Sequence, residues 1–204
     1  MKEEIIKFLE NNPKIEKILK KDHRSYVFTF IYQNKLYVYK EPIEKNTRKW
    51  QRFLAIFRGR ESKREFKQMQ KINSLGFKTA TPIFYEKNFL VYEYVDGRKP
   101  FINENEINLV VEELKKIHSK GFLHGDSHLA NFLITNKNEI YIIDSKFQKN
   151  KYGKFGEIFE LMYLEKSLEK EISYDKTSFY YKIALLFKKF LTFLSNLKNF
   201  IRRK

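Results

Sequence analysis

The pattern of apolar and polar residues in the first half of the chain predicts an antiparallel sheet. Aromatic and β-branched residues alternate with polar ones over short runs, and turn residues such as Gln33 and Asn34 separate these runs. The predicted strands are residues 26–32, 36–40, 83–85 and 89–95. In the second of these strands Lys40 shares a face with two apolar residues, so its charge needs a partner.

Apolar residues spaced three and four apart predict helices around this sheet. The predicted helices are residues 3–20, with an interruption at Pro13, residues 61–75 and residues 104–120. In the helix 61–75, Glu65 lies on the apolar face, so its carboxylate should point toward the sheet and pair with Lys40. Glu61 is the alternative partner.

Two further stretches combine basic residues with an apolar stripe. Residues 45–64 suit an amphipathic helix at a membrane surface or over a phosphorylated sugar, and a solvated basic face on a packed helix is an equal alternative. Residues 180–204 also predict an amphipathic helix, which ends in three basic residues. Packing of its stripe inside the domain is the favoured interpretation, and membrane contact is the alternative. The stripe consists of Ile183, Phe187, Phe190, Leu194, Leu197 and Ile201.

The segment 124–144, HGDSHLANFLITNKNEIYIID, carries three oxygen-bearing side chains in a pattern that suits phosphoryl transfer. Asn131 opens an apolar run, a polar turn follows, and a second apolar run returns to Asp144. The predicted hairpin therefore brings Asn131 and Asp144 together, and two such oxygens suit Mg²⁺. Asp126, in the preceding loop, is then free to accept a proton from an attacking hydroxyl. The alternative is that all three are ordinary loop and strand-end residues.

Composition and charge limit which cellular compartment and which partners we expect for this protein. The net charge of +16 predicts an anionic partner such as phosphates, acidic lipid or nucleic acid, although the lysine richness can also reflect coding bias. The absence of cysteine excludes a disulfide scaffold and a thiolate metal site, and it fits the cytoplasm. No signal peptide and no membrane-spanning run is expected, so the protein should be soluble or peripheral.

Several motifs resemble those of the protein-kinase-like superfamily. VYK with Lys40 resembles the lysine that holds ATP phosphates, Glu65 resembles its helix partner, and FLVYEYVDG resembles the hinge between two lobes. The resemblance implies an α+β fold in which residues 1–204 form one compact, two-lobed kinase-like domain. Residues 1–95 would be a small antiparallel-sheet lobe with a leading helix, and residues 96–204 a shortened, mainly helical lobe.

The same resemblance implies a role for each candidate site residue. The backbone of Glu93, Tyr94 and Val95 would receive the adenine of ATP, Asp126 would be the catalytic base, and Asn131 and Asp144 would hold Mg²⁺. Two histidines flank this base: His124 and His128 are expected to brace the catalytic loop by hydrogen bonds, with contact between His128 and the acceptor as the alternative.

The catalytic segment also points to a class of acceptor. HGDSHLANF is closer to small-molecule and lipopolysaccharide kinases, which favour HGDxHxxN, than to protein kinases with HRD, and it resembles most the lipopolysaccharide core heptose kinases. That resemblance implies a cytoplasmic, monomeric enzyme, peripheral at the inner face of the inner membrane. It would phosphorylate a heptose of the lipopolysaccharide inner core from ATP and Mg²⁺, and an anionic membrane surface would be a partner.

Departures from the family pattern keep other functions open. KKDHRSYVF, before Lys40, has no glycine, so either Arg24, Ser25 and backbone amides cover the ATP phosphates or ATP is held more loosely there. Ser145 and Lys146 stand where protein kinases have Phe-Gly, which argues against a regulated activation loop. The rivals are a kinase for Kdo, another small molecule or a protein, and a catalytically silent kinase-like binding module. Binding of nucleic acid, which rests on charge alone, is not expected.

Overall fold

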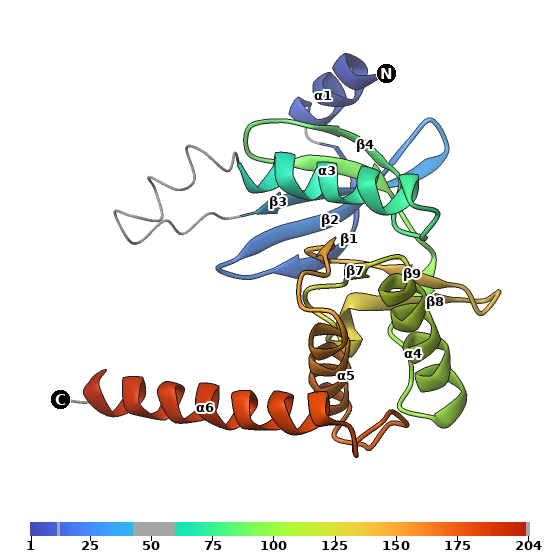
Figure 1. Cartoon of the computed structure of the whole chain (residues 1–204). Helices are drawn as coiled ribbons and strands as arrows, with labels where there is room; N and C mark the ends of the chain where they lie inside the picture. Colours follow the sequence, from blue (N-terminus) through green and yellow to red (C-terminus); the bar gives the residue numbers. More distant parts are fainter. Residues whose placement is uncertain (12, 43–59, 203–204) are drawn as a thin grey trace. The chain divides into compact units, whose positions relative to one another are not determined.

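The computed structural model describes residues 1–11, 13–42 and 60–202 (Figure 1). Most of the predicted amphipathic segment 45–64 lies outside the described residues. The chain divides into two compact units: residues 1–98 with 133–144 form the first, and residues 99–132 with 145–204 form the second. The hairpin 133–144 therefore groups with the first unit, whereas the division expected from the sequence places it in the helical lobe.

The main sheet of the first unit has five antiparallel strands, and it contains the four predicted strands. The strands are β1 (Ile15–Lys21), β2 (Ser25–Tyr32), β3 (Lys35–Pro42), β4 (Pro82–Tyr85) and β5 (Leu90–Glu93), in the order β1-β2-β3-β5-β4. Gln33 and Asn34 connect β2 to β3 with φ angles of 48° and 60°. Two consecutive positive φ angles match the right-handed twist of a tight hairpin, which explains the asparagine in this turn.

The first predicted helix is wrong in its second half. α1 (Lys2–Glu10) ends before Pro13, and β1 pairs with β2 from Ile15, opposite Phe30, to Lys21, opposite Tyr26. Pro13 cannot donate to a helical ladder, so the helix stops and the chain joins the sheet as an edge strand. The apolar residues of β1 are exposed by 41–50% because this edge strand has little cover.

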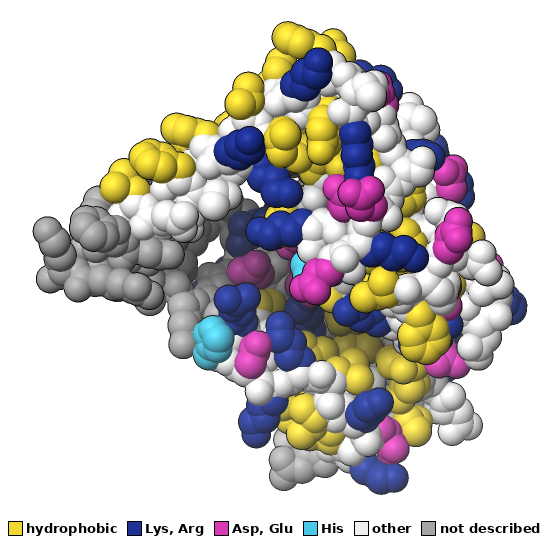
Figure 2. Space-filling view, turned by 90° about the horizontal axis from the view of Figure 1, so that it is seen from below, with side chains coloured by type: hydrophobic (Ala, Val, Ile, Leu, Met, Phe, Trp, Pro, Cys, Tyr) yellow, Lys and Arg dark blue, Asp and Glu magenta, His cyan; other side chains and the backbone are white. Residues whose placement is uncertain are grey.

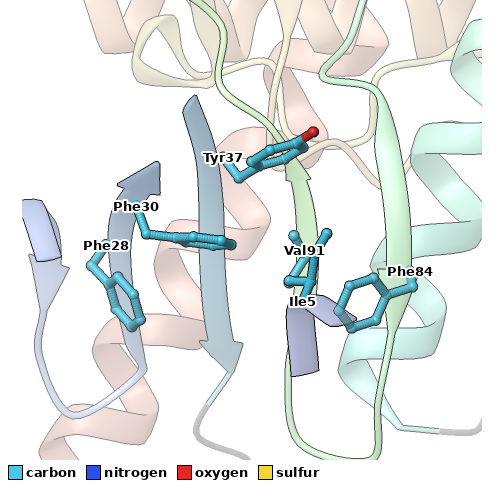
Figure 3. Packing of buried hydrophobic residues seen from close by; sticks show 6 residues of the cluster. All are labelled: Ile5, Phe28, Phe30, Tyr37, Phe84 and Val91. Carbon is cyan, nitrogen blue, oxygen red and sulfur yellow. The ribbon is translucent and has the colours of Figure 1, made fainter. Parts of the chain in front are cut away.

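The core of the first unit lies between α1 and the sheet. Figure 3 shows its buried side chains, which come from α1 and from four strands. They are Ile5, Phe28, Phe30, Tyr37, Phe84 and Val91. Tyr39 extends this core by stacking on Phe28 and Phe89, with ring centroids 4.7 and 4.8 Å apart. Burial of each large side chain stabilises the fold by about 1.5–3 kcal/mol, so α1 holds the sheet that carries Lys40.

A helix and a small sheet complete the first unit. α3 (Glu61–Ser74) buries Met69 and Ile72, as its apolar stripe predicts. The predicted hairpin is also present, because β8 (Phe132–Thr135) and β9 (Ile140–Ile142) form a three-stranded sheet with β6 (Gly97–Arg98). The backbone N–H of Ile142 donates to the Lys78 carbonyl at 2.8 Å, and the Thr79 hydroxyl donates to the Ile142 carbonyl at 2.6 Å. These bonds fix the end of β9.

The second unit is mainly helical. Its elements are α4 (Glu104–Ser119), β7 (Phe122–Leu123), the 3₁₀ helix η1 (Leu129–Asn131), β10 (Gln148–Lys149), α5 (Lys154–Leu168) and α6 (Phe179–Arg202). α4 begins at an N-cap: the Asn103 side-chain oxygen accepts from the Glu106 N–H at 2.9 Å, and the Asn103 side-chain nitrogen donates to the Glu106 carboxylate at 3.2 Å. Its predicted apolar stripe is buried.

α6 packs through only part of its predicted stripe, because Phe187 contacts Phe155 and Phe159 of α5. Tyr181, Ala184 and Leu185 lie against α5, whereas Phe190 and Leu194, from the stripe, are exposed by 53% and 41%. The sequence pattern identifies the helix but cannot show which of its sides meets the domain. Among the described residues, no helix is long and apolar enough to cross a membrane.

One half-buried carboxylate in the second unit, that of Glu165, gives a prediction about how stability depends on pH. Glu165 of α5 accepts hydrogen bonds from Lys176 at 2.7 Å, from the Tyr174 hydroxyl at 2.9 Å and from the Ile172 N–H at 3.2 Å. Burial alone would raise the pKa of Glu165, but these three bonds outweigh burial and lower the pKa below its ordinary value of 4.5. The stability that Glu165 contributes is therefore complete above the unfolded pKa and is lost as the pH falls through the folded pKa.

Glu165→Gln is expected to lower the free energy of unfolding by about 1 kcal/mol at pH 7 and by much less below pH ~4. Urea denaturation at the two pH values measures the difference. Glu171→Gln is the matched control, since Glu171 is 93% exposed beside the same lysine. A cost for Glu165→Gln that stays constant across this pH range would contradict the account.

Candidate active site

An ion-paired cluster of three charged side chains lies within the first unit. The Lys40 amine on β3 donates to the Glu65 carboxylate on α3 at 2.6 Å and to the Asp144 carboxylate after β9 at 2.5 Å. Lys40 and Glu65 are only 14% and 17% exposed. Glu65 is therefore the partner that the helical spacing predicts, and Glu61 forms an ion pair with Arg64 instead.

The two carboxylates of this cluster stabilise the charged form of Lys40. Burial alone would lower the pKa of Lys40, but the carboxylates of Glu65 and Asp144 outweigh burial and raise the pKa above its usual value. Burial raises the pKa of Glu65, and Lys40 works against that rise. Lys40 is thus a fixed cation at neutral pH, held by one carboxylate from a helix and one from a hairpin.

Asp144 has a backbone conformation that suits a functional position. Its φ of 49° lies in the left-handed region, which non-glycine residues adopt at a cost of about 1 kcal/mol and which aspartate tolerates better than most. The hydrogen bonds that end β9 hold this conformation. The Asp144 side chain is 52% exposed, so its carboxylate can bind Lys40 and still accept a further ligand.

A cavity of about 340 Å³ in the first unit opens beside the cluster. Its walls are largely apolar, with five charged side chains among them, and all its lining residues belong to the first unit. The apolar lining residues include Val27, Val38, Met69, Ala80, Leu133 and Ile143, and the charged ones are Lys17, Lys20, Lys40, Glu65 and Asp144. A cavity of this size with a mainly apolar lining and several charged side chains suits a ligand with a flat ring and an anionic group.

The segment after β5 offers one free donor to this cavity. The Glu93 N–H donates to the Thr81 carbonyl at 2.9 Å, and the Tyr94 N–H donates to the Leu36 carbonyl at 3.0 Å. Among the described residues, the Val95 N–H has no backbone partner, and Val95 lines the cavity. The sheet already uses the Tyr94 N–H, and the expectation that the backbone of Glu93, Tyr94 and Val95 receives the adenine stays a prediction.

The turn between β1 and β2 contains no glycine and is stabilised by the Asp22 side chain. The Asp22 carboxylate accepts from the N–H groups of Arg24 and Ser25, both at 2.8 Å, and these bonds lower the pKa of Asp22. The two backbone amides are therefore not free to cover an anionic ligand, contrary to one of the two expectations for this segment. Lys17 and Lys20, which line the cavity, supply positive charge there instead.

The loop 124–131 in the second unit is held by its own hydrogen bonds. His124 Nδ1 accepts from the Asp126 N–H at 3.3 Å, and His128 Nδ1 accepts from the Ala130 N–H at 3.2 Å. The Asn131 amide donates to the Asp126 carbonyl at 2.9 Å. Both histidines thus make the bracing contacts expected of them. Asn131 ends η1, ahead of the hairpin strand, and its predicted proximity to Asp144, a residue of the first unit, stays a prediction.

The Asp126 carboxylate is free to act on a ligand. Its backbone is fixed on both sides, because its carbonyl also accepts from the His128 N–H at 2.8 Å. The side chain is half-buried, and within the described parts of the chain no group donates a hydrogen bond to its carboxylate. A fixed backbone with an uncommitted carboxylate is the arrangement that a general base requires.

A buried glutamate that the sequence did not single out supports this loop. The Glu160 carboxylate on α5 accepts from the N–H groups of His124 at 3.0 Å and Gly125 at 2.5 Å, and it contacts His118 Nε2 at 3.0 Å. The Ser127 hydroxyl donates to the Glu160 carbonyl at 2.9 Å. Its position in the sequence could have indicated burial. Glu160 lies four residues after Gly156 and four before Leu164, on the same side of the helix, and all three residues are buried.

The segment after Asp144 also packs on this loop. The His124 carbonyl accepts from the N–H groups of Lys146 and Phe147, both at 3.0 Å, and from the Ser145 hydroxyl at 2.7 Å. Gly125 makes this approach possible: its φ is 82°, and an added Cβ would lie 2.9 Å from the Lys146 Cβ. Ser145 and Lys146, which replace Phe-Gly, therefore anchor the loop.

The sheet with its buried lysine, the helix that supplies the paired glutamate, and the HGDSH loop define a protein of the protein-kinase-like class, as predicted. The chain belongs to the RIO domain family, whose model matches residues 8–151. Two solved structures of the Rio2 kinase from Chaetomium thermophilum share the fold at 15% sequence identity. One is its ADP/Mg²⁺-phosphoaspartate complex, with a TM-score of 0.52, and the other has a TM-score of 0.54. Each alignment covers 88% of this chain, and they cover 63% and 65% of the Rio2 chains.

A curated relative is the lipopolysaccharide core heptose(II) kinase WaaY of Escherichia coli (strain K12). It is 28% identical to this chain over 106 residues, and the match covers 45% of this chain and 45% of WaaY. The chain is therefore similar to less than half of that protein.

Proposed function

We propose that this protein is an ATP-dependent kinase that phosphorylates a sugar hydroxyl, specifically a heptose of the lipopolysaccharide inner core. The cluster of Lys40, Glu65 and Asp144, which lines a largely apolar cavity, carries the proposal. Membership of the RIO domain family and the similarity to Rio2 kinases support phosphoryl transfer. The match to WaaY supports the heptose.

The cavity and its charges suit ATP. The adenine would lie between the apolar walls, with the Val95 N–H as donor. The resemblance to kinases gives the Glu93 carbonyl as its acceptor. Lys40 would hold the phosphates, and Lys17 and Lys20 would supply the positive charge that a glycine-rich loop would otherwise provide by backbone N–H groups.

The donor set also suits Mg²⁺. Asp144 offers an exposed carboxylate, and Asn131 offers an amide oxygen, since its amide nitrogen is already bonded to the Asp126 carbonyl. When bound there, Mg²⁺ would neutralise charge on the ATP phosphates. Asp126 would accept the proton of the sugar hydroxyl, and the basic surface of the protein would attract an acidic glycolipid and disfavour a cationic acceptor.

The acceptor can be identified in cells. Mass analysis of the core oligosaccharide from cells with and without the gene is expected to show loss of one phosphate on heptose when the gene is absent. Complementation with the Asp126→Asn form should not restore that phosphate. An unchanged phosphate content would exclude the heptose, and Kdo, another small molecule or a protein would then be the acceptors to test.

A RIO-type activity is the second candidate, and the family match favours it. The described Rio2 complex contains a phosphoaspartate, so an aspartyl-phosphate intermediate is a distinct chemical possibility. Incubation with γ-labelled ATP and no acceptor distinguishes the two, because an acyl phosphate is cleaved by hydroxylamine and a sugar phosphate ester is not. Stable, hydroxylamine-sensitive labelling of the protein would favour the RIO-type activity.

Lys40→Met is expected to weaken ATP binding at least about tenfold. The change removes the cation that faces the phosphates and leaves the buried Glu65 carboxylate without its partner, which also destabilises the fold by about 3 kcal/mol. Isothermal titration calorimetry measures ATP affinity, and thermal denaturation measures the stability. Lys35→Met is the control, since Lys35 is exposed on the same strand. Equal ATP affinity in the two variants would contradict the assignment of Lys40.

A further inference from the structure

α6 has one side packed and the other uncovered. Tyr181, Ala184 and Leu185 contact α5, and Phe187 touches Phe155 and Phe159 at ring-centroid distances of 5.9 and 5.6 Å. Only these first turns lie beside α5, and the helix continues beyond them (Figure 1).

The uncovered side is strongly apolar. Its residues recur at intervals of three and four, so they lie along one side of the helix. They are Phe179, Ile183, Leu186, Phe190, Phe193 and Leu197, exposed by 71%, 37%, 66%, 53%, 62% and 45%. Leu191 and Leu194, exposed by 43% and 41%, widen this surface beyond a narrow seam. We call these eight residues the outer face of α6.

The charges of α6 indicate what covers the outer face. Residues 179–204 contain seven basic residues and no aspartate or glutamate. In the helix, Lys182 and Lys189 are exposed beside the outer face, and apolar and basic side chains are neighbours on the surface shown in Figure 2. Two copies of α6 packed together would bring like charges into contact, and no acidic residue of the helix could pair with them. The complementary partner is therefore anionic and apolar at once.

We propose that α6 docks in the plane of an anionic phospholipid surface, with its outer face among the headgroups and upper acyl chains. The helix has exposed phenylalanine and leucine on one side and lysine beside them, and it is not apolar enough to span a bilayer. These are the properties of an interfacial helix. The proposal does not depend on the identity of the acceptor. It gives the protein a means of concentrating at a membrane.

Flotation of the purified full-length protein with lipid vesicles tests this surface. We expect binding to vesicles of equal parts phosphatidylcholine and phosphatidylglycerol, and at least tenfold weaker binding to phosphatidylcholine alone. Phe190→Ser with Phe193→Ser should weaken binding to the anionic vesicles at least about tenfold, because two large apolar side chains no longer enter the lipid. Lys182→Gln with Lys189→Gln should weaken it about tenfold and reduce its dependence on salt.

A matched control changes exposed residues of the same helix outside the outer face. Thr192→Ala with Ser195→Ala should bind vesicles as the unchanged protein does, and all variants should keep their ATP affinity and thermal stability. Light scattering after size exclusion reports self-association. Failure of the unchanged protein to bind anionic vesicles would overturn the proposal. So would a dimer that the two phenylalanine changes convert to a monomer while vesicle binding persists.

Discussion

Asp126→Asn is expected to slow phosphate transfer by a factor of about 10³ while ATP affinity stays within about twofold of its original value. Asparagine has nearly the same shape as aspartate but cannot accept the proton of the acceptor hydroxyl. The loop should keep its conformation, because its hydrogen bonds to His124, His128 and Asn131 use the backbone of residue 126 and not its carboxylate.

Transfer rates and ATP affinity, measured on the same preparation, test this prediction. Asp96→Asn is the control. Asp96 is an exposed aspartate, and it is not expected to accept a proton in the reaction. Transfer that survives in the Asp126→Asn protein would show that Asp126 is not the base. Loss of ATP affinity in the same variant would show that its effect is structural.

Glu160→Ala is expected to lower the free energy of unfolding by about 3 kcal/mol. The change leaves the backbone N–H groups of His124 and Gly125 buried without an acceptor and removes the partner of His118. Transfer should fall as well, because these two residues carry the loop that presents Asp126.

Urea denaturation of two variants in the same helix isolates the contribution of Glu160. Glu157→Ala loses only a surface ion pair with Lys154 and should change the stability by less than about 0.5 kcal/mol. Glu160→Gln keeps one acceptor oxygen and should fall between the alanine variant and the unchanged protein. Similar costs for Glu157→Ala and Glu160→Ala would contradict the supporting role of Glu160.

Local patterns predict the sheet well and its edge poorly. β2, β3 and the turn between them follow from alternation and from Gln33-Asn34, which are local signals. β1 was expected to be helical because Ile15, Ile18 and Leu19 are spaced three and four apart, as on a helix. Pairing with β2 decides the structure of this segment, and pairing is not a local property.

In the candidate site, too, contacts that follow from local spacing are predictable and contacts between residues far apart in the sequence are not. The inward position of Glu65 follows from helical spacing and correctly predicts the pair with Lys40. Asp144 was expected from the hairpin and the motif, but its bond to Lys40 joins residues 104 positions apart, so no local pattern could reveal it. Glu160 was missed for the same reason, since its partners lie 35 and 36 residues earlier.

We propose that this protein transfers phosphate from ATP to a sugar hydroxyl. The most direct measurement incubates the purified protein with γ-labelled ATP, Mg²⁺ and core oligosaccharide whose heptoses carry no phosphate, and follows the product by mass analysis. We predict a single phosphate ester on heptose that forms with the unchanged protein and not with the Asp126→Asn protein. ATP binding without any labelled oligosaccharide, or equal labelling by both proteins, would contradict the claim.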